Sequence, residues 1–591
     1  MGTTVPLRPE ISQSPVPWPV RDLFVAIALF LATTGFVLWQ NSQVAVLWDL
    51  SYLLDTSYRI SLGQMPYRDF PLVHPPLTFL IQAVLMRFAG RVYPLQIAYA
   101  ALVGGLGSVI AWRILLSTLR ERVQHAWTVS LLLAAPLSVV GIYSIYPHPI
   151  YDCDCTFAIL VAVFLLQRFG PNEVSGSSVL RKWVRPALTG AAVVLPVFFK
   201  QNMGLPFLLA VVAGVLSLLA ARLLGVTKRS IAFDRPDTAD LLRLLATITA
   251  VFLAALALIQ LLAGLGNYLH WTVRFAGERR LPGFADMLAV YHQPAFLWTL
   301  PTLAAGLLLL HSRYASKLWG EILGICLVSA PFLGSIVFLF LNDDLDERGD
   351  NLLALWPLLL LVSAFFAIAQ LRKGITLARL MPFFVLAAIH GTFLSQQLWG
   401  STYAIWPLLM VLVAQILTSI PQTSRLSALT LATAISATFL VCGSFYAVGH
   451  ERLNYIQIPD TPLSRATLPA LRGIADRGPF LPDFEELVRF ADKEIPVQDG
   501  LLLLPGEDPF YFATGRAPQF PVLLLDRTTD PYSPEELLAT ARSHDTQWVI
   551  VKRRLQLNDD PLPQRERVMA LVASEFTLYR KLNGYDVYRR L

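Results

Sequence analysis

The residues best suited to chemistry begin with Asp49, which directly follows the first apolar run of the chain. If that run spans a membrane, this carboxylate lies at the bilayer edge, where a phosphate and an incoming hydroxyl can meet. Asp49 can equally cap a surface helix, and the sequence leaves both interpretations open. Asp55 falls six residues later, off the helix face of Asp49, and is expected to be solvated or capping.

The second and third polar clusters also stand at the ends of apolar runs. Residues 146–155 contain Asp152 and Asp154, which point about 200° apart on a helix, so sequence cannot choose between them. Either acid can instead stabilise the helix N-terminus through its dipole. Lys200 lies between two apolar runs, where its ammonium can meet a phosphate or simply reach up to the membrane surface.

Two further clusters carry cations. His270 and Arg274 are four residues apart and share a face if their segment is helical, although an amphipathic surface helix has the same pattern. Arg348 stands in an acidic and basic run that can also be a solvated loop. Tyr403 can belong to the aromatic belt of a membrane protein.

The composition around these clusters is that of a membrane protein. Of 591 residues, 55% are hydrophobic and 15% are charged, and the mean hydropathy is +0.54. Soluble domains are about a quarter charged. The net charge of +6 is too modest to indicate nucleic-acid binding, and the four cysteines form no disulfide framework or zinc site. About thirteen apolar runs are long enough to span as helices: 22–40, 94–117, 126–147, 153–169, 185–200, 203–223, 241–265, 294–311, 318–341, 351–371, 380–396, 402–420 and 425–448.

Basic residues predict the orientation of these spans, because Lys and Arg gather in short cytoplasmic loops. They fall in alternate loops, which predicts a cytoplasmic tail (1–21), a membrane domain (22–450) and an outer C-terminal domain (451–591). Counting Pro75–Gly90 as a span would invert the later assignments, so we interpret it as a helix at the outer interface. Interfacial helices are therefore expected in the outer loops 41–93 and 266–293.

The C-terminal segment has an ordinary soluble composition and predicts a small α/β domain. Pro482–Glu494 predicts a helix, and Ser533-Pro534 opens another with an N-cap serine and a proline at the first position. Short buried strands are predicted at Leu501–Leu504, Val522–Leu525, Val549–Lys552 and Tyr585–Tyr588. The segment has no phosphate-binding glycine loop or nucleophile motif, which favours a structural or acceptor-docking role.

In order and layout, the polar clusters resemble those of the GT-C glycosyltransferases, which use polyprenyl-phosphate sugars and include the protein O-mannosyltransferases and lipid A aminoarabinose transferases. In that family an Asp after the first span precedes a Gly and a Pro-Pro-Leu motif, as Asp49, Gly63 and His74-Pro75-Pro76-Leu77 do here. The chain departs from the family in Leu50, where Glu is common, and in His74, where Lys is common. The resemblance implies a polytopic α-helical GT-C fold of about 13 transmembrane helices.

The resemblance also implies roles for individual residues. Asp49 is expected to be the catalytic carboxylate, with Asp152 or Asp154 as a second acid; both of the latter are candidates to hold a divalent cation. The candidates for binding the donor phosphate are His74, Lys200, His270, Arg274 and Arg348. The candidates for binding substrate are Tyr52, Tyr67, Asp69 and Tyr403.

The implied reaction moves a sugar from a polyprenyl-phosphate donor to a hydroxyl of a lipid, glycan or protein acceptor, with inversion and with Asp49 as general base. It is expected on the outer face of a bacterial inner membrane. A polymerase or ligase of polyprenyl-diphosphate glycans would favour a large basic outer loop and no acid after the first span. A transporter would favour charges or broken helices at mid-membrane. The sequence has neither pattern.

Overall fold

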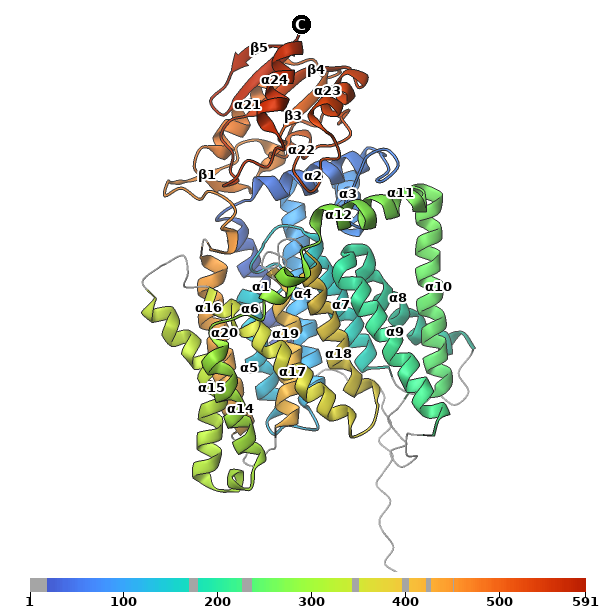
Figure 1. The fold of residues 1–591 in the computed structure, drawn as a ribbon, viewed down its shortest axis with the longest axis vertical. Coiled ribbons are helices and arrows are strands. Elements are labelled where there is room, and N and C mark those ends of the chain that lie inside the picture. The colour runs from blue at the N-terminus through green and yellow to red at the C-terminus, as the bar shows by residue number, and fades with distance from the viewer. Residues whose placement is uncertain are drawn as a thin grey trace, which may run out of the picture.

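The computed structural model describes residues 19–169, 179–225, 236–342, 350–395, 403–420, 427–449 and 451–591. A helical bundle forms one end of the molecule, and a β-sheet with its covering helices forms the other (Figure 1). Arg348 and most of the predicted tail 1–21 lie outside the described residues.

Within the described part of the chain, eight helices are long and apolar enough to cross a membrane. They are α1 (Val20–Asn41), α4 (Tyr93–Leu119), α8 (Val179–Phe199), α9 (Gln201–Leu223), α10 (Thr238–Leu262), α15 (Leu318–Leu341), α18 (Leu377–His390) with its 3-10 extension, and α20 (Ser427–Val448). These helices make the chain an integral membrane protein, as its composition predicts.

Shorter helices complete the bundle. They are α5 (Ala126–Ala134), α6 (Leu137–Val140), α7 (Tyr151–Gln167), α14 (Phe296–His311), α16 (Asp350–Leu353), α17 (Leu355–Leu371) and α19 (Trp406–Ser419). Each predicted apolar run coincides with one or more of these helices in its described part. The number of spans, about thirteen, stays a prediction, because eight helices among the described residues have the length and composition to cross by themselves.

Small residues let the central helix α4 approach its neighbours closely. A Cβ on Gly105 would lie 2.6 Å from the Phe30 ring of α1, and one on Gly104 would lie 2.6 Å from the Ile142 carbonyl oxygen. Both positions therefore need glycine, as is common where membrane helices pack without a hydrophobic driving force between them.

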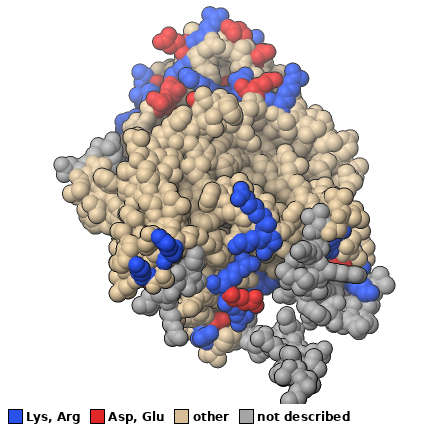
Figure 2. All heavy atoms as spheres, turned by 60° about the horizontal axis from the view of Figure 1, so that its bottom comes forward, with Lys and Arg blue, Asp and Glu red and all other residues tan. Residues whose placement is uncertain are grey.

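Charge is distributed unevenly over the surface. Figure 2 brings forward the end of the bundle that lies far from the sheet and shows Lys and Arg side chains gathered on it, below a broad belt with no charged residues. Arg122, which follows α4, and Arg379, in the first turn of α18, line one hollow. An uncharged belt between two charged ends is what a bilayer requires of a protein that spans it.

Short helices lie between the bundle and the sheet (Figure 1). The segment between α1 and α4 forms α2 (Leu47–Ser61) and α3 (Leu77–Ala89). The segment after α10 forms α11 (Leu265–Leu269), a π-helix (His270–Phe275), α12 (Ala276–Arg280) and α13 (Phe284–Ala289). Helix α2 carries Asp49 in its first turn, so its placement decides where that carboxylate lies.

The C-terminal region contains a two-stranded and a four-stranded sheet. Strands β1 (Leu463–Arg465) and β2 (Ala475–Arg477) are antiparallel. The larger sheet has the order β3 (Gly500–Leu504), β4 (Thr546–Lys552), β6 (Tyr585–Arg590) and β5 (Phe576–Lys581), with only β3 and β4 parallel. The helices of this region are α21 (Phe480–Glu494), α22 (Phe510–Thr514), α23 (Pro534–Ser543) and α24 (Arg565–Glu575).

Successive side chains of β4 point to opposite faces of the sheet, and each face has its own hydrophobic core. Trp548 and Ile550 pack with α21 and α22, whereas Val549 and Val551 pack with α23 and α24. The first core also includes Leu47, Leu50 and Leu54 of α2. The helix that carries Asp49 therefore shares a hydrophobic core with the C-terminal region.

The predicted helices and three of the four predicted strands of this region are present. The predicted strand Val522–Leu525 is wrong, because these residues form a loop in which Leu525 N–H donates to the Pro505 carbonyl oxygen. Its apolar side chains are buried against the sheet, and a short buried apolar loop has the same sequence pattern as a buried strand. Strand β5 was not predicted, because its residues after Phe576 are exposed and lack a buried run.

Candidate active site

Asp49 lies at the meeting point of three segments far apart in the sequence. Its Oδ2 accepts hydrogen bonds from the hydroxyls of Tyr146, at 2.8 Å, and Tyr455, at 2.7 Å. Among the described residues, Oδ1 accepts no hydrogen bond and is left to receive a proton. Asp49 does not cap its own helix, so the capping interpretation of this residue has no support from the geometry.

Burial raises the pKa of Asp49 above the ordinary carboxyl value, and the nearby charge of Asp152 raises it further. The hydroxyls of Tyr455 and Tyr146 oppose this shift because they stabilise the carboxylate. Tyr146 also stacks on Tyr403, with ring centroids 5.1 Å apart, and Tyr403 is buried. The predicted substrate residue Tyr403 thus supports the tyrosine that contacts Asp49.

Asp152 and Asp154 stand in the first turn of α7 and have different surroundings. Asp152 forms a buried ion pair with Lys200, the residue that precedes α9. Asp154 points elsewhere: its oxygens accept hydrogen bonds from Thr78 at 2.7 Å, Tyr99 at 2.8 Å and Tyr143 at 2.7 Å. Only Asp152 is therefore joined to a cation, while Asp154 ties helices of the bundle together.

His74 links Arg280 of α12 to Tyr52 of α2. The guanidinium of Arg280 donates to His74 Nε2 at 2.8 Å, and the Tyr52 hydroxyl lies 2.9 Å from Nδ1. Because arginine only donates, Nε2 must accept, so the proton of the neutral ring is on Nδ1. Burial and the charges of Arg280 and Lys200 hold the pKa of His74 well below its ordinary value. His74 thus contacts both Arg280 and Tyr52, and its role in binding the donor phosphate stays a prediction.

Tyr151 connects the two cation-bearing groups. Its ring stacks on His74 at 4.0 Å between centroids, and the Lys200 ammonium lies 5.4 Å from the ring centroid. Arg280 is near enough to interact electrostatically with both Tyr151 and Asp49. Two carboxylates, Asp49 and Asp152, and two cations thus lie near a single aromatic ring.

The other predicted residues lie outside this group. Asp69 pairs with its neighbour Arg68 at 2.8 Å and closes a local turn through Met65 N–H. His270 is exposed, and Arg274 is exposed and pairs with Glu278. Tyr67 is buried and donates to the His74 carbonyl oxygen at 2.6 Å, so it supports the loop but does not line the site.

Asp55 is buried rather than solvated, because it accepts hydrogen bonds from the backbone of α22, from Phe512 N–H at 2.7 Å and Tyr511 N–H at 3.2 Å. It thus caps a helix of the C-terminal region rather than its own. Burial raises the pKa of Asp55 to about 8.

Asp152 and Asp154 were each candidates to hold a divalent cation. The side chain of Asp154 accepts its hydrogen bonds from hydroxyl groups, and Asp152 has the Lys200 ammonium beside it. Within the described ranges, no group of three His, Cys, Asp or Glu side chains gathers in a metal-binding arrangement. A divalent cation at either acid therefore stays a prediction.

Arg280, Tyr151 and Tyr455 were not predicted. The sequence prediction chose His270 and Arg274 because residues four apart share a face of an α-helix. In the structure His270–Phe275 is a π-helix, which has a wider turn, so the α-helical spacing does not hold there. Tyr151 directly precedes Asp152, and this proximity was the available signal. Nothing in the sequence marks Tyr455, which is 406 residues from Asp49.

Comparison with known proteins identifies the fold. No protein-family model and no curated protein matches the chain. The archaeal oligosaccharyltransferase AglB from Archaeoglobus fulgidus, in complex with an inhibitory peptide and a dolichol-phosphate, is similar with TM-score 0.50 and 11% identity, over 90% of this chain and 69% of that one. The same enzyme tethered to an acceptor peptide gives TM-score 0.50 and 11% identity over 97% and 74%. ArnT from Cupriavidus metallidurans bound to undecaprenyl phosphate gives TM-score 0.42 and 11% identity over 98% and 99%.

At such low identity the likeness to AglB concerns the fold alone. AglB is a GT-C glycosyltransferase, so the GT-C fold implied by the order of the polar clusters is confirmed. The chain is an integral membrane protein of the GT-C fold, with Asp49 near the buried Lys200–Asp152 ion pair and Arg280.

Proposed function

We propose that this protein is a glycosyltransferase that moves a sugar from polyprenyl phosphate to a hydroxyl acceptor, with inversion. The observation that carries the proposal is the grouping of Asp49 with Lys200 and Arg280 around Tyr151. A carboxylate beside cations suits a displacement in which a hydroxyl loses its proton while a phosphate leaves. The dolichol-phosphate bound by AglB, which shares the fold, supports a lipid phosphate as the leaving group.

In the proposed step, the acceptor oxygen forms a bond to the anomeric carbon as the bond from that carbon to the phosphate oxygen breaks. The electron pair stays on the phosphate, whose charge is neutralised by Lys200 and Arg280. The acceptor proton passes to Asp49, whose Oδ1 is available for it. His74 orients Arg280, and Asp152 holds Lys200. A single displacement of this kind inverts the anomeric centre.

The distribution of charge supports a proposed orientation. The basic end of the bundle in Figure 2 is the cytoplasmic end under the positive-inside rule. The site and the C-terminal domain (451–591) then lie on the outer face, with the N-terminal tail (1–21) in the cytoplasm. We place the protein in a bacterial inner membrane, with a hexose or pentose as the transferred sugar and a lipid, glycan or protein as the acceptor.

The test is transfer of label from radiolabelled polyprenyl-phosphate hexose or pentose to an acceptor, in membranes that contain the wild-type protein. Asp49→Asn is expected to abolish transfer, and Asp69→Asn is the matched control, because Asp69 is an exposed acid of the same loop that lies outside the site. Label transferred only from polyprenyl-diphosphate glycans would contradict the proposed donor. Equal transfer by wild type and Asp49→Asn would contradict the proposed base.

A further inference from the structure

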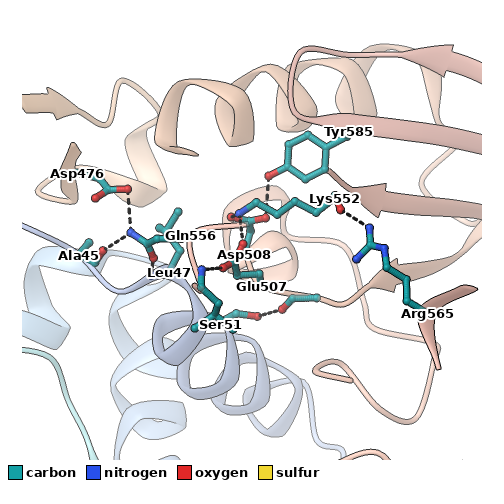
Figure 3. Close-up of polar contacts among 12 residues, drawn as sticks. Ala45, Leu47, Ser51, Asp476, Glu507, Asp508, Lys552, Gln556, Arg565 and Tyr585 are labelled. Carbon is teal, nitrogen blue, oxygen red and sulfur yellow. Dashed lines mark hydrogen bonds and ion pairs between the residues drawn. The ribbon is translucent and has the colours of Figure 1, made fainter. Parts of the chain in front are cut away.

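The helix that carries Asp49 begins against the C-terminal domain. The first N–H groups of a helix lack partners within it, and the N-cap residue Val46 supplies no side-chain hydrogen bond. Instead, the N–H of Leu47 donates to Gln556 Oε1 at 2.8 Å, and Gln556 Nε2 donates to the Ala45 carbonyl oxygen at 2.9 Å (Figure 3). Gln556 is fully buried, and it comes from a loop 509 residues away in the sequence. One amide side chain therefore caps this helix from another domain.

Gln556 is itself held by a buried polar network (Figure 3). Its Nε2 also donates to Asp476 Oδ2 at 3.0 Å. The next residue, Leu557, donates its N–H to Glu507 at 2.8 Å, and Glu507 pairs with Lys552 at 2.6 Å. Lys552 is the last residue of β4, so the loop that bears Gln556 is fastened to the end of a central strand. Because these contacts hold Gln556 in one position, its side chain can in turn hold the start of α2 in place.

Further contacts hold the rear of the same helix. Ser51 Oγ donates to the Gly506 carbonyl oxygen at 2.6 Å, and Asp55 accepts the N–H of Phe512 at 2.7 Å. At about 100° per residue, these two side chains lie about 200° and 240° around the helix from Asp49. The C-terminal domain therefore contacts the face of α2 that points away from the site, and Asp49 lies on the opposite face.

Such support matters because α2 is short. It has 15 residues, and isolated helices of about 12–15 residues are marginally stable in water. Asp49 stands in the first turn, where a helix without a cap frays first. The same domain also contributes the Tyr455 hydroxyl that contacts Asp49.

We propose that the C-terminal domain is a working part of the active site, in which Gln556 caps α2 as a positioning residue and sets the place of Asp49. This role rests on the proposed function of Asp49 as base, and it differs from a merely structural or acceptor-docking role for the domain. It predicts that loss of the cap lowers turnover and leaves the affinity for donor unchanged, because Lys200 and Arg280 belong to other elements.

The test compares Gln556→Met with Ser533→Ala in the full-length protein. Methionine keeps the length of glutamine and removes its hydrogen bonds. Ser533→Ala also removes a helix cap, the hydrogen bond from Glu536 N–H to Ser533 Oγ at 3.3 Å, but on α23, which packs in the other core of the same domain. Hydrogen exchange at the amides of residues 47–50 and the kcat and KM for polyprenyl-phosphate sugar are measured in both variants.

Gln556→Met is expected to speed exchange at residues 47–50 roughly fivefold, the usual effect of a lost helix cap, and to lower kcat at constant KM. Ser533→Ala is expected to change neither. Unchanged exchange in Gln556→Met, or equal acceleration in Ser533→Ala, would overturn the proposal. If Gln556→Met does not fold, Ser51→Ala tests the same interface with the same readouts. Faster exchange in a protein whose wild type transfers no sugar would keep the capping role and reject the proposed function.

Discussion

Removal of the Tyr455 hydroxyl should change the pH dependence of sugar transfer. Tyr455 and Tyr146 both donate to Asp49 Oδ2, and both stabilise its charged form. In Tyr455→Phe the carboxylate loses one of these donors, so its pKa rises. Because a general base must be deprotonated, kcat/KM falls as pH drops through this pKa, and the acidic limb of the profile moves to higher pH.

The size of the shift follows from the strength of the bond. A hydrogen bond to a charged group contributes about 1.5–3 kcal/mol to stability. One pH unit corresponds to about 1.4 kcal/mol, so the limb should move by about one to two pH units. Tyr146→Phe should move it in the same direction, since its hydroxyl makes an equivalent contact.

The assay is sugar transfer from the polyprenyl-phosphate donor over a range of pH, with kcat/KM measured for wild type, Tyr455→Phe and Tyr585→Phe. The last variant is a matched control, because it also removes a tyrosine-to-aspartate hydrogen bond of 2.7 Å but lies away from the site. An acidic limb that stays in place in Tyr455→Phe, with activity lowered equally at every pH, would refute the role of Asp49 as base.

Four more outcomes follow from the site. Asp154→Asn should lower the thermal stability of the detergent-solubilised protein, by about 1–3 kcal/mol for each hydroxyl left without an acceptor, and unchanged stability would contradict its structural assignment. Lys200→Met should destabilise by about 3–5 kcal/mol because Asp152 is left buried and unpaired, and the double variant with Asp152→Asn should recover part of this loss in unfolding measurements. Arg280→Gln should raise the KM for donor, and a variant with unchanged donor kinetics would remove Arg280 from the phosphate site. Treatment with EDTA should leave transfer unchanged if Lys200 and Arg280 supply the positive charge, and a loss that Mg²⁺ restores would contradict this.

The parts of the fold that depend on local composition could be predicted from the sequence. Apolar length identified the helices of the bundle, and alternate basic loops led to the interpretation of Pro75–Gly90 as a helix at the outer interface, where the structure has the 13-residue helix α3. Asp49 was singled out because it follows the first apolar run, and its catalytic role stays a prediction. The strand predicted at Val522–Leu525 failed, since a buried loop and a buried strand have the same apolar composition.

The site itself depends on contacts that local patterns do not encode. Helical spacing showed that Asp152 and Asp154 point apart, but only the packing of α7 shows which of them meets Lys200. His74 matched a motif, yet its charge is decided by Arg280, which lies 206 residues away. Gln556 caps α2 from the other end of the chain, and a buried glutamine in a loop has no signature in a single sequence.

The central claim is that Asp49 accepts the proton of the acceptor hydroxyl. It is tested most directly by single-turnover sugar transfer with purified Asp49→Asn, alongside a measurement of donor binding in the same preparation. The account predicts normal donor binding and a transfer rate lower by about 10²–10⁴-fold, which is the usual contribution of a general base. Normal donor binding with transfer at the wild-type rate would contradict it.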